Sequence, residues 1–227
     1  PTHTHTVCAL LIALGLASPA FAITRVLDFD TDANGNDIVA GQIIDDEYAD
    51  WGINIVVDNF DRTPEGTINP NKDFGVAFDT ANPSGGDWDL QTPGYGPNNN
   101  TALGNALIIQ EKGHPDDSGD FLGSKRVKGW HQESNGSWDW GWYDQPYEPD
   151  DEGSRPAGMF DFIFDAVQSA GRIDFLDIEQ GGERGGTISF YNSGTELTGE
   201  ELSIADLGDN SFQSIDFSGF EYDRMMV

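Results

Sequence analysis

The chain has 227 residues, and its 40 Asp plus Glu residues face only 11 Lys plus Arg, which gives a formal net charge of -29. Phosphate backbones and anionic lipids repel a surface of this sign, so the composition argues against a nucleic-acid-binding or peripheral membrane protein. A hydrophobic content of 37% and an aromatic content of 11% also exclude a disordered acidic tail, and the length suits one large all-β domain.

Residues 1–22 are uncharged and contain the apolar stretch from Val7 to Leu16, followed by Phe21 between two alanines. This pattern is typical of a signal peptide, and the stretch is too short to span a bilayer, so we expect export and no integral membrane span. Cys8 is the single cysteine, and an intrachain disulfide is therefore excluded. If the segment is retained, it could instead add a strand to a neighbouring subunit. The donor-strand residues would be Val7, Leu10, Leu11, Ile12 and Leu14.

Residues 23–227 are expected to form a single domain made of short apolar or alternating runs separated by Gly, Asn, Asp and Pro. The runs predict an all-β fold, an antiparallel, jelly-roll-like β-sandwich of about nine strands. The predicted strands are 23–29, 52–57, 74–78, 106–110, 159–164, 172–178, 187–191, 212–217 and 222–227. A turn of helix is expected within 44–51, and 112–157 is expected to be one long Trp-rich loop. The last run ends in mid-strand, which suggests a sandwich that lacks its final strand and has an open edge.

An acidic segment follows the first predicted strand and runs Asp28-Phe-Asp30-Thr-Asp32-Ala-Asn34-Gly35-Asn36-Asp37. Read from Asp30, it begins like an EF-hand loop, with oxygen ligands at positions 1, 3 and 5 and Gly at position 6. Position 12 is Gly41 where a bidentate Glu is required, so a true EF-hand is not expected. Either another kind of calcium loop or a cluster of Asx turns that needs no metal would explain the pattern.

A second acidic group contains Asp87 and Asp89 on either side of Trp88. In extended backbone, alternate side chains point the same way, so both carboxylates could reach one cation. Calcium, which accepts six to eight oxygen ligands, is the cofactor expected for these loops. The predicted metal ligands are Asp28, Asp30, Asp32, Asn34, Asp37, Asp87 and Asp89.

The third feature is aromatic, because four of the six Trp lie within thirteen residues of the predicted long loop. Flat rings beside polar groups suit sugar rings, but Trp and Tyr also anchor protein interfaces or close a loop over a core. All three alternatives remain open from the sequence. The candidate glycan or interface residues are Trp130, Trp138, Trp140, Trp142 and Tyr143.

Catalysis has little support in the sequence, because His114 and His131 lie in no recognisable triad or metal motif. Carboxylate pairs suited to glycoside hydrolysis are expected by chance among forty acidic residues, so they identify no enzyme. We therefore expect a protein that is not an enzyme. Asn99 and Asn135 match the N-glycosylation sequon weakly.

Several segments resemble a family of secreted bacterial β-sandwich proteins that often carry a PEP-CTERM sorting tail. They include Asp45-Asp-Glu-Tyr-Ala-Asp-Trp-Gly-Ile-Asn54, Phe78-Asp-Thr-Ala-Asn-Pro-Ser-Gly-Gly-Asp87-Trp-Asp89-Leu and Phe160-Asp-Phe-Ile-Phe-Asp165. The resemblance implies a β-sandwich exported to the bacterial cell surface or extracellular matrix. It supplies no catalytic residues.

These observations lead us to expect a non-catalytic extracellular structural subunit, stabilised by calcium, whose partners are copies of itself. A spare apolar strand at one end and an open edge at the other would allow head-to-tail assembly into a surface fibre by β-strand addition. The alternative is a secreted, calcium-dependent carbohydrate-binding module with a glycan partner.

Overall fold

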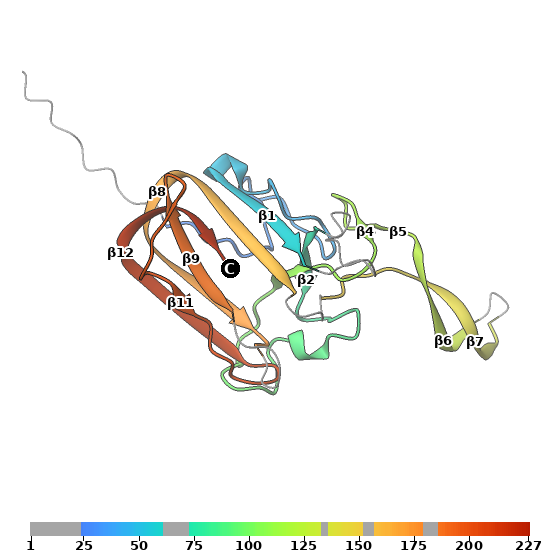
Figure 1. The fold of residues 1–227 in the computed structure, drawn as a ribbon. Helices are drawn as coiled ribbons and strands as arrows, with labels where there is room; N and C mark the ends of the chain where they lie inside the picture. Colours follow the sequence, from blue (N-terminus) through green and yellow to red (C-terminus); the bar gives the residue numbers. More distant parts are fainter. Residues whose placement is uncertain (1–23, 61–72, 133–135, 152–156, 179–185) are drawn as a thin grey trace, which may run out of the picture.

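The computed structural model describes residues 24–60, 73–132, 136–151, 157–178 and 186–227. The described part of the chain is all-β, and its sheets are antiparallel (Figure 1). The donor-strand residues Val7, Leu10, Leu11, Ile12 and Leu14 lie outside the described residues, as does Asn135.

The largest sheet has six strands in the order β1-β8-β12-β9-β10, with β11 also paired to β9. Its strands are β1 (Ile53–Asn59), β8 (Gly158–Leu176), β9 (Thr187–Asn192), β10 (Thr195–Glu196), β11 (Leu202–Ser203) and β12 (Phe212–Met226). A second sheet pairs β2 (Gly75–Asp79) with β3 (Asn105–Ile109). Two 3-10 turns, η1 (Ala49–Trp51) and η3 (Trp88–Leu90), join these elements, and η1 lies within the turn of helix expected at 44–51.

A hydrophobic core lies between the two sheets. It joins Ile55 of β1 and Phe190 of β9 to Ala77 of β2 and Ile109 of β3. Ala77 points into this core, while its neighbours in β2 belong to a smaller cluster beneath η3. Because β2 is buried on both faces, the β2–β3 pair forms the second layer of a sandwich. The all-β, antiparallel fold class is confirmed, and the number of strands differs from the nine predicted.

Two pairs of predicted strands are each one continuous strand. The nineteen-residue β8 contains 159–164 and all but the last two residues of 172–178, and the fifteen-residue β12 contains 212–217 and all but the last residue of 222–227. Ser218 and Gly219, which lie between the two predicted runs 212–217 and 222–227, are at a register shift between β12 and β8. β12 pairs with β8 along most of its length, and Arg224, Met225 and Met226 at its end also pair with β9 on the other side. Whether a further strand follows β12 stays a prediction.

The first predicted strand, 23–29, is wrong over its described residues, because 24–29 make no strand pairing. Leu27 and Phe29 are partly buried and pack against the core, which explains the apolar pattern. The Phe29 amide donates a hydrogen bond to Tyr48 Oη (3.0 Å). Phe29 also has a φ of 58°, which is incompatible with a strand.

The prediction of one long loop over 112–157 is also wrong. Two hairpins occupy most of it: β4 (His114–Pro115) with β5 (Phe121–Leu122), and β6 (Ser124–Gln132) with β7 (Trp138–Pro146). The β6–β7 hairpin is a long two-stranded ribbon that projects away from the sandwich (Figure 1).

Candidate functional site

The β6–β7 ribbon brings the four clustered tryptophans to one face. Trp130 lies opposite Trp140 in the strand register, and Lys128 lies opposite Trp142. Side chains alternate between the faces of a strand, so the even-numbered residues of both strands share one face, here called the aromatic face. The aromatic face consists of Arg126, Lys128, Trp130, Gln132, Trp138, Trp140, Trp142 and Asp144.

The four indoles of the aromatic face are exposed. Their exposed fractions are 62% for Trp130, 66% for Trp138, 52% for Trp140 and 59% for Trp142. The rings of Trp130 and Trp140 contact each other edge to face, with centroids 5.7 Å apart. The alternative in which these residues close a loop over the core is therefore wrong, and the glycan and interface alternatives remain.

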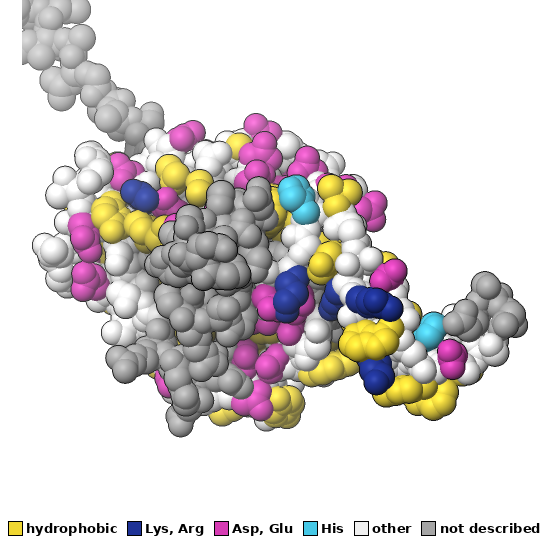
Figure 2. Space-filling model, turned by 45° about the vertical axis from the view of Figure 1, so that its right-hand side comes forward, with side chains coloured by type: hydrophobic (Ala, Val, Ile, Leu, Met, Phe, Trp, Pro, Cys, Tyr) yellow, Lys and Arg dark blue, Asp and Glu magenta, His cyan; other side chains and the backbone are white. Residues whose placement is uncertain are grey.

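Cationic side chains accompany the indoles, although the chain is strongly acidic. Arg126 Cζ lies 5.8 Å from the centroid of the Trp142 ring, and Lys128 Nζ lies 5.9 Å from it. Both distances are within the range of cation–π attraction. Figure 2 shows hydrophobic side chains gathered with Lys and Arg on the ribbon. The sequence interpretation missed Arg126 and Lys128, and the period-two spacing of Arg126, Lys128 and Trp130 is the signal that could have identified them.

Tyr143, the fifth predicted aromatic residue, lies on the opposite face of the ribbon. Its ring stacks on His131, with centroids 4.7 Å apart and an angle of 24° between the planes. On this face Gly129 lies opposite Gly141. The Tyr143 ring lies over Gly129, and a Cβ added to this glycine would be 3.7 Å from the ring. Tyr143 thus helps to build the ribbon and does not belong to its aromatic face.

A buried glutamine holds the base of the ribbon. Gln110 Nε2 donates to the carbonyl oxygens of Lys112 (2.6 Å) and Glu148 (3.1 Å), and its Oε1 accepts from the Asp150 amide (3.2 Å). Lys125 at the start of β6 pairs with Glu148 (3.3 Å). Gln110, which directly follows β3, therefore fixes both the segment that enters the two hairpins and the segment that leaves them.

The predicted metal loop at 28–37 uses its carboxylates to bind backbone amides. Asp28 Oδ1 accepts from the amides of Asp30 and Thr31 (both 3.1 Å). Asp32 Oδ1 accepts from the Asn34 amide (2.8 Å), and hydrogen bonds from Asn36 lower the pKa of Asp32. These are the bonds of Asx turns.

The remaining predicted ligands of this loop point to separate places. Asp30 Oδ1 accepts from the Asn105 amide (2.8 Å), and Asn34 Nδ2 donates to Asp50 Oδ2 (2.9 Å). Asp37 pairs through its backbone with Thr31. Asp32 and Asn34 line a shallow depression of about 340 Å³. The depression is also lined by Gln42, Asp46, Glu47, Ala49 and Asp50.

Asp87 takes part in a crowded carboxylate group at the ribbon base. Its Oδ2 accepts from the Asp151 amide (3.2 Å). Burial, and then the Asp87 charge, raises the pKa of Asp151 to about 8 and that of Asp150 to about 6. Burial also raises the pKa of Asp87. These groups resist ionisation together, so a cation or a proton must offset their charge near neutral pH.

Asp89 belongs to a different cluster. One carboxylate oxygen from each of Asp89, Asp177 and Asp209 lies within 4.8 Å of the others. Asp177 Oδ1 also accepts from the Asn210 amide (2.5 Å), and Tyr95 Oη donates to Asp209 Oδ1 (2.7 Å). The oxygen donors of this group and of the Asp87 group fit a hard cation such as Ca²⁺.

The glycosylation prediction at Asn99 does not agree with the folded structure. Asn99 is only 2% exposed, and its Nδ2 donates to the carbonyl oxygens of Gln91 (2.8 Å) and Asn210 (3.1 Å). A glycan cannot be attached to a side-chain amide that is buried and hydrogen-bonded in this way.

Comparison of the chain with known proteins gave no match to any protein-family model, to any curated protein or to any solved structure. Among the described residues, no helix has the length and apolar character needed to cross a membrane.

Proposed function

We propose that this protein is a non-catalytic, extracellular structural subunit that assembles head to tail, with the β6–β7 ribbon as its contact arm. The observation that carries the proposal is the exposure of four tryptophans on one face of a projecting ribbon. The N-terminal donor strand lies outside the described residues, and the proposal does not depend on it.

The aromatic face is large enough to require a partner. With about 250 Å² for a fully exposed indole, half- to two-thirds-exposed rings present roughly 600 Å² in total. An apolar patch of this size is at the upper limit for a monomer and marks an interaction site. A two-stranded hairpin is also only marginally stable alone in water, so covering its face would stabilise the ribbon itself.

A second copy of the chain is the partner that the charges favour. Arg126 and Lys128 flank the indoles, whereas the whole chain carries a net charge of -29. The arm of one copy is thus attracted to the acidic body of another. In the described part of the chain, β6 and β7 pair only with each other, so their outer edges could also add a strand. An arm that contacts a different surface makes a heterologous contact, which propagates into a filament.

Calcium is the cofactor that we propose for the acidic clusters. Asp87 and Asp151 approach each other at the ribbon base, and Asp89 approaches Asp177 and Asp209 nearby. Bound Ca²⁺ would let these carboxylates ionise without mutual repulsion. Since Asp150 and Gln110 belong to the same base, the cation would also stiffen the arm.

A carbohydrate-binding module is the second candidate, and the position of four exposed indoles on one face of the ribbon favours it. Sugar rings stack on flat aromatic faces, and Gln132 and Asp144 on the same face could bind hydroxyl groups. This module would use the same residues without self-assembly.

Sedimentation velocity of the full chain in millimolar calcium tests the proposal. The wild type is expected to form species that grow with protein concentration, and a Trp138→Ala/Trp140→Ala/Trp142→Ala variant is expected to remain monomeric. Trp88→Ala is the matched control, because Trp88 is 65% exposed but belongs to η3 and not to the aromatic face. Assembly of the triple variant at the wild-type level would refute the proposal. A monomeric wild type that binds glycans through these tryptophans would establish the alternative.

A further inference from the structure

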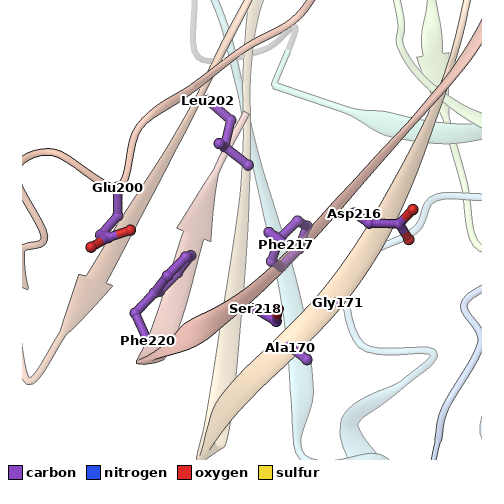
Figure 3. A pocket seen from close by; sticks show the side chains of 8 residues that line it. All are labelled: Ala170, Gly171, Glu200, Leu202, Asp216, Phe217, Ser218 and Phe220. Atoms are coloured by element: carbon purple, nitrogen blue, oxygen red, sulfur yellow. The ribbon is translucent and has the colours of Figure 1, made fainter.

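A groove of about 540 Å³ opens on the larger sheet, at the bend of β8 and β12 and beside β11. Its apolar lining comes from Leu202, Phe217 and Phe220. In Figure 3 the two phenylalanine rings and Leu202 lie between Glu200 on one side and Asp216 on the other.

The groove has a fixed shape because of close packing beneath it. The position of a Cβ on Gly171 lies 2.6 Å from the Phe217 ring and 3.0 Å from Tyr222 Oη, so only glycine lets this ring lie against β8. The rings of Phe220 and Phe190 pack edge to face, with centroids 4.8 Å apart. The apolar floor is therefore part of the folded core and not a mobile surface.

The charges at the groove are mainly acidic. Glu200 is exposed at its rim. Asp216 is paired in the β8–β12 register with Arg172, which also bonds Asp174 (2.8 Å), so the charge of Asp216 is partly offset within the chain. The groove thus presents the partly exposed Leu202 and Phe220 above the buried Phe217, beside carboxylates, whereas the aromatic face of the ribbon presents indoles beside Arg126 and Lys128.

We propose that the groove of one copy accepts the aromatic face of the β6–β7 ribbon of a second copy, with Glu200 facing Arg126 and Lys128. The inference rests on the proposed function and names its acceptor site. The groove is open to the surface, and its volume of about 540 Å³ leaves room for indole side chains of the aromatic face. Tryptophan and arginine are among the residues in which interface hot spots are enriched.

The positions of the two surfaces determine the form of the assembly. The groove lies at the bend of β12, and the ribbon projects from the opposite end of the molecule (Figure 1). A copy therefore cannot place its own ribbon in its own groove. Each copy offers one arm and one groove, and repeated contacts produce a head-to-tail chain.

Charge reversal tests the acceptor site with the full chain. Glu200→Lys is expected to weaken association about tenfold or more, because the new cation faces Arg126 and Lys128. Glu196→Lys is the matched control: it makes the same charge change at an exposed residue that does not line the groove. Adding Lys128→Glu to the Glu200→Lys chain should restore part of the lost association.

Mixing two assembly-defective variants distinguishes the acceptor site from the arm. The ribbon triple variant keeps its groove and the Glu200→Lys variant keeps its ribbon, so the mixture should form one-to-one dimers and nothing larger. If the Glu200→Lys variant assembles like the wild type while the ribbon variant stays monomeric, the groove is not the acceptor site, but the ribbon is still the contact arm. Wild-type assembly of the ribbon variant would overturn both the groove and the proposed function.

Discussion

Replacing Trp140 by alanine should weaken self-association about 30- to 150-fold and leave the fold almost equally stable. At 52% exposure, Trp140 presents an area of about 130 Å², taking about 250 Å² for the whole indole. Burying that area is worth at most about 3 kcal/mol at 25 cal/mol per Å². Incomplete burial lowers the figure to about 2 kcal/mol, the usual threshold of an interface hot spot.

The stability of the monomer should barely change, because Trp140 fills no core cavity. The variant loses only the edge-to-face contact with Trp130, which is worth about 0.5–1.5 kcal/mol within the ribbon. Sedimentation equilibrium measures the association constant, and thermal unfolding followed by circular dichroism measures stability. An association constant within threefold of the wild-type value would refute the reasoning. A large fall in the unfolding midpoint would show that Trp140 acts in folding instead.

Three further predictions concern the ribbon base. Calcium should raise the unfolding midpoint, by an amount corresponding to about 2.7 kcal/mol of stability when free calcium is in hundredfold excess over its dissociation constant. Asp87→Asn should reduce this shift. If EDTA leaves the midpoint of the wild type unchanged, calcium does not stabilise the fold. In chelator, the free energy of unfolding should fall as the pH rises from about 4 to about 8, because Asp151 has its pKa raised to about 8 in the folded state and ionises earlier in the unfolded chain. Asp151→Asn should flatten this slope in a denaturant titration at each pH, and an unaltered slope would exclude the assignment. Gln110→Leu should lower the free energy of unfolding by about 2–4 kcal/mol, since the carbonyl oxygens of Lys112 and Glu148 lose their donor. Amide hydrogen exchange should increase more in the ribbon than in β8. An equal increase in both would contradict the role of Gln110.

The strands β1, β2, β3 and β9 were predictable because each has buried residues on one face or on both. Alternation in β1 and the apolar run of β2 are direct consequences of that burial. The continuity of β8 and β12 could not be predicted, because Gly219 lies at a register shift that depends on the pairing of β12 with β8. The segment 24–29 shows the opposite error, since apolar residues can pack on a core without pairing.

The candidate site was predicted only in part. The sequence identified the tryptophans as a group, but the period-two spacing of Trp138, Trp140 and Trp142 was not interpreted as a strand, so their shared face was missed. Asp87 and Asp89 were expected to act together, but Asp87 contacts the Asp151 amide and Asp89 lies close to Asp177 and Asp209. Such groupings depend on contacts across more than sixty residues of sequence.

The groove could not be predicted from the sequence, because it too depends on contacts between distant residues. Its lining comes from three separate stretches, at 170–171, 200–202 and 216–220. Leu202, Phe217 and Phe220 have the pattern of ordinary strand residues, and nothing local shows that they share a concave surface beside Glu200.

Zero-length carbodiimide cross-linking of a mixture of ¹⁴N- and ¹⁵N-labelled full chains tests the central claim most directly. The Lys125–Glu148 ion pair lies within one chain at 3.3 Å, so its cross-link should carry a single label and serves as an internal reference. Cross-links from Lys128 should carry mixed labels and should lead to Glu200. If peptides from β6 show single labels only, in samples that sedimentation shows to be assembled, the ribbon is not the contact arm.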